Sequence, residues 1–199
     1  MISEKFKIIL GYILICLIWG STWLAIRIGL DSLTPIFSAG IRFILASIFI
    51  YILMRLNNIE LQKDSSSMRL YLILSLFSFT IPFGLVYWAE QFIPSGLASI
   101  LFAMLPFGVI IFSFLAFENY KVSFNQLLGV ILGFAGIVII FSENLSFNLS
   151  DYFWGTLAVL LSAFMQASIA VIIKKYGEHL NPLSMNFLPL LFSGLIIAT

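Results

Sequence analysis

Long runs of apolar residues, separated by short polar breaks, account for most of the chain. A helix needs about 20 apolar residues to cross a bilayer whose hydrocarbon core is about 30 Å thick. The runs lack the period of two that membrane strands show, so helices are expected. The pattern predicts an all-α polytopic membrane protein with seven transmembrane helices, at Ile8–Leu30, Ile36–Met54, Leu70–Ala89, Ile93–Phe117, Val122–Phe141, Tyr152–Ile173 and Leu183–Thr199.

The composition excludes most soluble protein classes. Hydrophobic residues make up 61% of the chain and charged residues 10%, whereas soluble domains average about 25% charged residues. The net charge of +1 gives no signal for nucleic acid as a partner. Cys16 is the only cysteine, so neither an internal disulfide nor a cysteine metal site is expected. The expected surroundings are therefore a lipid bilayer, with no metal and no cofactor.

The distribution of basic residues predicts the orientation in the membrane. The positive-inside rule assigns the side that is rich in lysine and arginine to the cytoplasm. The first apolar run is too long for a signal peptide and lacks a small-residue cleavage site, so it is expected to remain as a helix. We expect a multi-pass membrane protein with a cytoplasmic N-terminus. Eight of the ten basic residues lie on the predicted cytoplasmic side: Lys5, Lys7, Arg55, Lys63, Arg69, Lys121, Lys174 and Lys175.

The stretch Pro82–Glu118 contains the strongest signals for helix packing and bending. Small residues recur at fourfold spacing along its second predicted helix, at Ser95, Ser99 and Ala103. Such a stripe lets another helix approach closely, and Pro106 in the same helix is expected to bend its axis. Gly129 and Gly133 form a GxxxG step that favours helix packing, including packing against a second protomer.

Two parts of the chain show weak similarity when one is shifted by 147 residues. Pro35 then aligns with Pro182, and Ser21 with Ser168. An odd number of predicted helices, five, separates the two copies, so the copies would lie in opposite orientations. Inverted repeats of this kind are typical of transporters that expose a central site alternately to each side.

Several segments resemble the EamA-type permeases of the drug/metabolite transporter superfamily. They are WGSTW (Trp19–Trp23), Thr34 and Pro35 followed by Arg42, AEQFIPSGLASILFAMLPF (Ala89–Phe107) and GVILGFAGIVIIF (Gly129–Phe141). The resemblance covers nearly the whole chain. It implies ten helices in two inverted five-helix repeats around a central cavity. It also implies secondary transport of small organic metabolites such as amino acids.

Under this resemblance, residues 1–145 form a first EamA-type repeat and residues 146–199 the beginning of a second, incomplete one. The simplest expectation is a truncated or partial sequence of a full-length transporter. The alternative is a non-transporting membrane subunit or a remnant that needs a partner chain, such as a second half-transporter. A homodimer is a further possibility.

Arg42 is the most informative charge in the predicted helices. It lies about 10 Å along its helix from Pro35, at a rise of 1.5 Å per residue. A charge at such depth faces the bundle interior or a wet cavity. Arg42 is therefore predicted either to attract a substrate carboxylate or to hold a neighbouring helix through its carbonyls.

Other polar or aromatic positions are candidates for lining a substrate cavity. A tryptophan beside small hydroxyls offers an apolar surface and hydrogen bonds, although anchoring at the membrane interface explains it equally well. The amide of Gln166, on one face with Ser162, is expected to face protein or water. The cavity candidates besides Arg42 are Trp19, Ser21, Thr22, Tyr87, Ser99, Met104 and Gln166.

Two further charges lie near the predicted outer ends of the helices. Arg27 is expected to reach the interface and to pair with Asp31, four residues later. Glu90 is expected at the outer mouth. A role linked to protons or cations is possible there, but a solvated loop carboxylate is the favoured interpretation.

Signals of an enzyme are absent from the sequence. No Gly-rich phosphate loop occurs, and no catalytic residue is predicted. His179, the only histidine, is expected to be a solvated loop residue without companion metal ligands. Transport would then be secondary, driven by a gradient of an ion or a solute.

Overall fold

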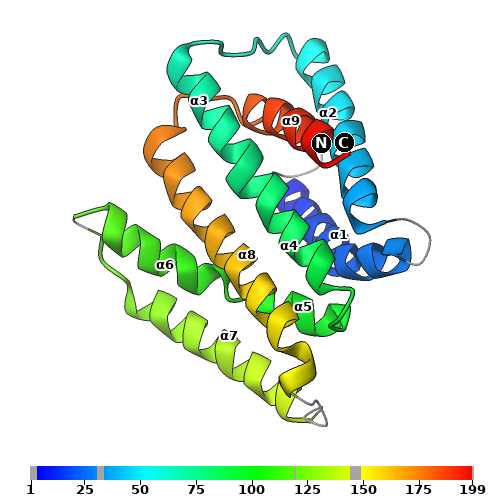
Figure 1. Cartoon of the computed structure of the whole chain (residues 1–199). Helices are drawn as coiled ribbons and strands as arrows, with labels where there is room; N and C mark the ends of the chain where they lie inside the picture. Colours follow the sequence, from blue (N-terminus) through cyan, green and yellow to red (C-terminus); the bar gives the residue numbers. More distant parts are fainter. Residues whose placement is uncertain (1–3, 31–33, 119, 144–148, 199) are drawn as a thin grey trace.

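The computed structural model describes residues 4–30, 34–118, 120–143 and 149–198, and these residues form a helical bundle without strands (Figure 1). This confirms the predicted all-α membrane fold. Five stretches are long and apolar enough to cross a membrane, and two shorter apolar helices correspond to the fifth and seventh predicted segments. The elements are α1 (Glu4–Leu30), α2 (Pro35–Leu56), α3 (Ser65–Leu74), the π-helix η1 (Ser75–Thr80), α4 (Ile81–Ala89), α5 (Ser95–Phe102), α6 (Leu105–Ala116), α7 (Phe124–Glu143), α8 (Leu149–Tyr176) and α9 (Ser184–Ala198).

The third predicted segment begins five residues earlier than expected. Asp64 caps α3, because its carboxylate accepts hydrogen bonds from the backbone N–H of Ser67 at 3.0 Å and from the Ser67 hydroxyl at 2.6 Å. These bonds lower the pKa of the Asp64 carboxyl. The polar run at residues 65–67 hid this helical turn from an apolar pattern, although Asp at an N-cap is a common helix start. His179 is exposed, as predicted, with its Nε2 3.4 Å from the Ser67 hydroxyl.

The helices α3, η1 and α4 follow one another and form one long helical rod. The π-helical turn η1 interrupts the α-helical geometry of this rod. The backbone N–H of Ile81 bonds to the carbonyl of Leu76, five residues back rather than four. Pro82 follows at once, and proline has no N–H to give to the carbonyl four residues before it, that of Ser78. The rod is therefore a place where backbone carbonyls need partners from other helices.

The fourth predicted segment is broken into α5 and α6. Ala103 and Met104 form the turn between the two helices, and Pro106 lies in the first turn of α6. Proline is tolerated there because the first N–H groups of a helix have no intrahelical partner. The bend that Pro106 predicts is thus present as a break just before it.

The helix α7 begins with a capping box. The Ser123 hydroxyl accepts from the backbone N–H of Gln126 at 3.2 Å, and the Gln126 amide oxygen accepts from the Ser123 N–H at 2.9 Å. This reciprocal pair satisfies two donors at the helix end. It explains why the polar residues that open the fifth predicted segment belong to the helix. In Figure 1, α7 lies beside α6 and away from α2 and α9.

Close backbone contacts join the helices of the bundle. A methyl group added at Gly194 of α9 would lie 2.7 Å from Cγ1 and 3.0 Å from the backbone N of Ile44 in α2. A methyl group added at Gly108 of α6 would lie 2.7 Å from the Cβ of Ala167 in α8. The helices α4 and α8 also run side by side (Figure 1). Small residues thus set the tight crossings, as in other membrane bundles.

The C-terminal third of α1 packs into the bundle. The side chains of α1 from Ile8 to Trp19 are largely exposed, as expected for a helix that contacts lipid. Ile26 is buried in a cluster with residues of α2, α4 and α9, and Trp23 packs against this cluster. The C-terminal end of α1 is therefore held against α2, α4 and α9.

Candidate functional site

An exposed arginine of α2 and a buried tyrosine of α4 meet at the edge of the apolar core. Nη1 of Arg42 donates a hydrogen bond to the Tyr87 hydroxyl at 2.8 Å. Tyr87 is only 2% exposed and belongs to the same apolar cluster as Ile26. Arg42 itself is exposed, and a guanidinium has five N–H donors. Tyr87 therefore holds Arg42 while leaving it donors for another acceptor.

Arg27 of α1 reaches the turn that follows α4. Its Nη1 donates to the backbone carbonyl of Glu90, which directly follows the span Ser65–Ala89. Carbonyls at a helix C-terminus carry partial negative charge and favour a cation. The predicted partner, Asp31, lies outside the described residues. Arg27 thus joins α1 to the end of α4, a contact that sequence spacing did not indicate.

Glu90 is buried, so its interpretation as a solvated loop carboxylate is wrong. Its residue is 0% exposed, and neither carboxylate oxygen has a hydrogen-bond partner within the described part of the chain. Burial raises the pKa of Glu90 to about 7, although the positive charges of Arg27 and Arg42 oppose this rise. The physical reason is the short turn between α4 and α5, whose neighbours Ala89 and Ile93 pack against α8 and enclose it.

Gln166 is engaged with the interrupted rod rather than open to a cavity. Its Nε2 donates to the Ser78 carbonyl at 2.7 Å, and its Oε1 accepts from the Ser78 hydroxyl at 3.3 Å. One turn away, the Ser162 hydroxyl donates to the Pro82 carbonyl at 3.0 Å. On the other side, the Ser193 hydroxyl of α9 donates to the Ser75 carbonyl at 2.8 Å. We call Ser75, Ser78, Pro82, Ser162, Gln166 and Ser193 the carbonyl clamp.

A cavity of about 350 Å³ lies between the second half of α1 and the helix α5. Two cavity candidates, Trp19 and Ser99, line it together with Ser95. Ser95 and Ser99 thus lie where α5 faces α1, and the buried residues of α5 are Leu97 and Ala98.

The hydroxyls of Ser21 and Thr22 are used within α1. They donate to the Ile18 carbonyl at 3.1 Å and 2.7 Å, which is a common bond for such residues inside helices. Both side chains lie near the cavity residue Trp19 in sequence, but neither lines that cavity. Met104 is half-buried in the turn between α5 and α6.

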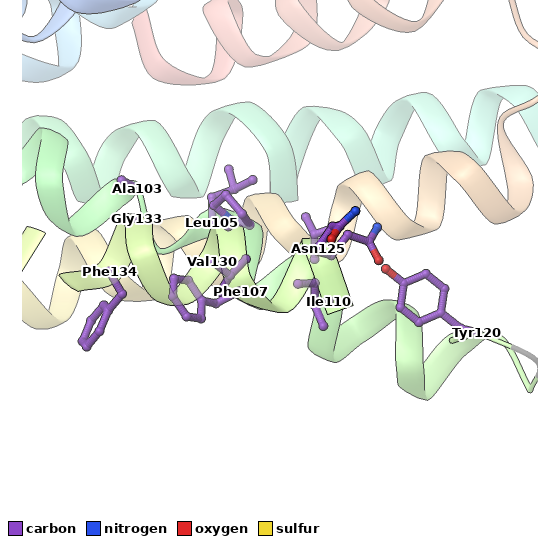
Figure 2. Close-up of a pocket in the computed structure, with 13 residues that line it drawn as sticks. Ala103, Leu105, Phe107, Ile110, Tyr120, Asn125, Val130, Gly133 and Phe134 are labelled. Atoms are coloured by element: carbon purple, nitrogen blue, oxygen red, sulfur yellow. The ribbon is translucent and has the colours of Figure 1, made fainter. Parts of the chain in front are cut away.

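A larger cavity of about 710 Å³ lies between α6 and α7 (Figure 2). It is mostly apolar, with Tyr120, Asn125 and Gln126 among its lining residues. The predicted packing residues Ala103, Pro106, Gly129 and Gly133 line this cavity. A methyl group at Gly129 or Gly133 would meet no atom within 4 Å. Within the described chain the GxxxG step therefore packs against no helix, and its packing on a second protomer stays a prediction.

The EamA-like transporter family model matches residues 6–142, which is more than half of the chain. The chain belongs to the EamA-like transporter family. This confirms the resemblance to EamA-type permeases. We call Arg27, Arg42, Tyr87 and Glu90 the charged site. All four residues lie within the matched part of this EamA-like chain.

Curated relatives cover the chain almost from end to end. Protein PagO of Salmonella typhimurium is 31% identical over 98% of this chain and 64% of its own length. An uncharacterized transporter in the trpA 3′ region of Buchnera aphidicola subsp. Schlechtendalia chinensis is 33% identical over 96% of this chain and 63% of its own length. The uncharacterized inner membrane transporter YedA of Escherichia coli K12 is 32% identical over 83% and 51%. The chain thus spans less than two thirds of the length of these relatives. No solved structure matches it.

The sequence of this EamA-like chain indicated part of the site. The depth of Arg42 indicated a charge that faces the bundle interior or a wet cavity, and in the described chain Arg42 is exposed while it bonds to the buried Tyr87. The shared face of Ser162 and Gln166 indicated a contact with another helix. The sequence did not indicate that Arg42 and Tyr87 pair, because their helices are not adjacent in sequence. Nor did it indicate that Ser193 bonds to the interrupted rod. The signal for this contact was a serine four residues after Pro189 in an otherwise apolar helix.

Proposed function

We propose that this chain belongs to a secondary transporter that moves small organic metabolites, such as amino acids, across the bacterial inner membrane. The observation that supports this most is the hydrogen bond from Arg42, an exposed residue about two turns into α2 and within its candidate membrane span, to the buried Tyr87. A charge in such a place marks a substrate or ion pathway more often than a structural contact. The chain is a multi-pass membrane protein of a transporter family, which agrees with this role.

The proposed orientation has a cytoplasmic N-terminus, as the basic residues predict. Arg27 and Glu90 then lie toward the outer face, where α1 ends and α4 turns into α5. Arg42 lies seven residues into α2, roughly 10 Å below the start of that helix. A solute from the outer side would thus pass Arg27, which is exposed, before it meets Arg42.

The proposed mechanism is alternating access between two inverted repeats. The close crossing of α2 and α9 supports it, because these helices belong to different predicted repeats and correspond to each other under the shift of 147 residues. Rocking of one repeat against the other would open the space around Arg42 to each side in turn. The cargo carboxylate would accept hydrogen bonds from the guanidinium donors that Tyr87 does not use.

Exchange of radiolabelled amino acids by the chain in liposomes tests this proposal. We expect Arg42→Ala to abolish exchange, and Arg42→Lys to restore only part of it because an ammonium cannot bind a carboxylate bidentately. Arg55→Ala, at an exposed arginine in the last turn of α2, is the matched control and should leave exchange unchanged. Normal exchange by correctly inserted Arg42→Ala would contradict the role of Arg42. Absence of exchange for all the amino acids would contradict amino acids as the cargo of this chain.

A further inference from the structure

We propose that Glu90 is a proton-binding site, neutral in the described conformation and ionised when the surrounding helices separate. In a transporter, such a site couples the movement of a solute to the movement of a proton. The coupling rests on the proposed function, whereas proton binding by Glu90 does not.

The surroundings of the carboxyl group favour its neutral form. Glu90 has no exposed surface, and both of its carboxylate oxygens lack a hydrogen-bond partner among the described residues. An ionised carboxylate without hydrogen bonds is far more costly to bury than a carboxylic acid. The helices α4, α5 and α8 surround the turn with a cluster of apolar residues that includes Ile93, Ala158 and Val159. The low polarity of this cluster adds to the cost of the charge.

Two positively charged groups near Glu90 would stabilise its ionised form after a movement of the helices. Arg27 of α1 and Arg42 of α2 are near enough to act on the carboxyl electrostatically. Their hydrogen bonds go elsewhere, to the Glu90 backbone carbonyl and to the Tyr87 hydroxyl. The other titratable group, Tyr152 of α8, packs at the edge of the same apolar cluster. A small shift of α1 or α2 would give an ionised Glu90 an arginine partner.

The position of Glu90 fits a gate. It lies in the turn between α4 and α5, beside the end of α1 and close to the proposed cargo site at Arg42. With the pKa of Glu90 raised to about 7, the proton would be taken up and released within the ordinary range of cellular pH. Protonation would favour the described packing, and loss of the proton would favour a conformation in which the carboxylate reaches Arg27 or Arg42.

A proton fits this site better than a metal ion. Hard cations bind through several oxygen ligands, whereas the Glu90 oxygens have no polar neighbour within hydrogen-bonding distance in the described residues. No cluster of three potential metal-binding His, Cys, Asp or Glu side chains occurs in this part of the chain either. The chemical class of the ligand is therefore a proton, carried on a single carboxyl group.

Infrared spectroscopy of the purified chain in lipid tests proton binding directly. Between about pH 5 and pH 9, we expect the carbonyl band of a protonated carboxylic acid to disappear with a midpoint near the raised pKa of Glu90. Glu90→Gln should lose this titrating band. Glu118→Gln, at an exposed carboxyl just after α6, should keep it and is the matched control. If Glu90→Gln does not fold, Glu90→Asp should keep a titrating band with a shifted midpoint.

Several outcomes would overturn proton binding. They are absence of a titrating band, its persistence in Glu90→Gln, and a midpoint that shifts when choline replaces sodium as the salt cation, since such a shift means that sodium binds. None of these readouts depends on transport, so they separate the failure of this site from the failure of the proposed function.

Solute flux under an imposed pH gradient tests the coupling. The wild-type chain and Glu118→Gln should respond to the gradient, and Glu90→Gln should lose the response. If the band titrates but wild-type flux ignores the gradient, the coupling is wrong and the proton site stands. If no variant carries flux while the band titrates, the proposed function fails and the proton site again stands.

Discussion

Two polar regions are buried in this apolar bundle, and they differ in how their polar atoms are satisfied. In the carbonyl clamp, the side chains of Ser162, Gln166 and Ser193 each donate to a backbone carbonyl of the interrupted rod. In the charged site, both carboxylate oxygens of Glu90 lack partners among the described residues. The clamp is built from neutral groups with fixed partners, whereas the charged site contains a group that changes its charge.

The difference shows which buried polar groups serve packing and which serve function. A paired amide or hydroxyl in a membrane bundle stabilises one arrangement of helices. An unpaired titratable group destabilises that arrangement. A fold that retains such a group therefore retains it for a function and not for stability. The side chains that donate to backbone carbonyls in the clamp come from α8 and α9, outside residues 6–142. In contrast, Arg27, Arg42 and Glu90 all lie within these family-matched residues.

The largest expected effect comes from overpacking the crossing of α2 and α9, next to the clamp residue Ser193. Gly194→Ala places a methyl group 2.7 Å from Ile44 Cγ1 and 3.0 Å from the Ile44 backbone N, and the backbone cannot yield locally. We expect a loss of about 3 kcal/mol of stability, the upper end for overpacking. Thermal unfolding in detergent, followed by tryptophan fluorescence, measures it. Gly84→Ala adds a methyl group with no atom within 4 Å and should change little, and an equal loss in both variants would refute the expectation.

Glu90→Gln should stabilise the fold, and only at higher pH. The folded chain holds the Glu90 proton more tightly than the unfolded chain, because burial raises the pKa from 4.5 to about 7. Stability therefore falls as the pH rises through this range and stays low above it. We expect Glu90→Gln to exceed the wild type by about 2 kcal/mol at about pH 8 and to match it near pH 4.5. Equal melting curves for both proteins at both pH values would show that the carboxyl is not buried.

Gln166→Leu tests how much the clamp contributes to the stability of the fold. It leaves the Ser78 carbonyl without the donor that Gln166 supplies, so the fold should lose about 1–2 kcal/mol at every pH. The absence of pH dependence separates this loss from the effect of Glu90. Gln91→Leu, at an exposed amide in the turn after α4, is the control and should be nearly neutral. A loss confined to high pH would place Gln166 with the charged site instead.

The smallest effect is expected at Thr80, the last residue of η1. Its hydroxyl is buried without a partner in the described residues, although it lies within the rod that the clamp holds. Thr80→Val keeps the shape and removes the unsatisfied hydroxyl, so a gain of about 0.5 kcal/mol is expected. The same melting assay measures it. A clear loss would mean that the hydroxyl has a partner in the membrane-embedded protein.

The sequence predicted the helices well because long apolar runs have no other stable form in a bilayer. It predicted less well where tertiary contacts decide. The polar pair Glu90 and Gln91 has the local pattern of a solvated loop, and only the packing of α1 and α8 around it makes Glu90 buried. The break at Ala103 has a similar cause, since Pro106 signals an interruption but not the residue at which the chain turns.

The π-helical turn at Ser75–Thr80 also determines how the two polar regions are aligned along one rod. A π-turn holds one residue more than an α-turn, and one residue corresponds to a rotation of about 100° around the helix axis. Removing a single residue from this turn would convert the rod into a continuous α-helix up to Pro82. Residues before the turn would keep their faces, while Tyr87 and Glu90 would turn by about 100° away from α1 and α2. The insertion or loss of one codon here would therefore connect or disconnect the charged site without altering any of its side chains.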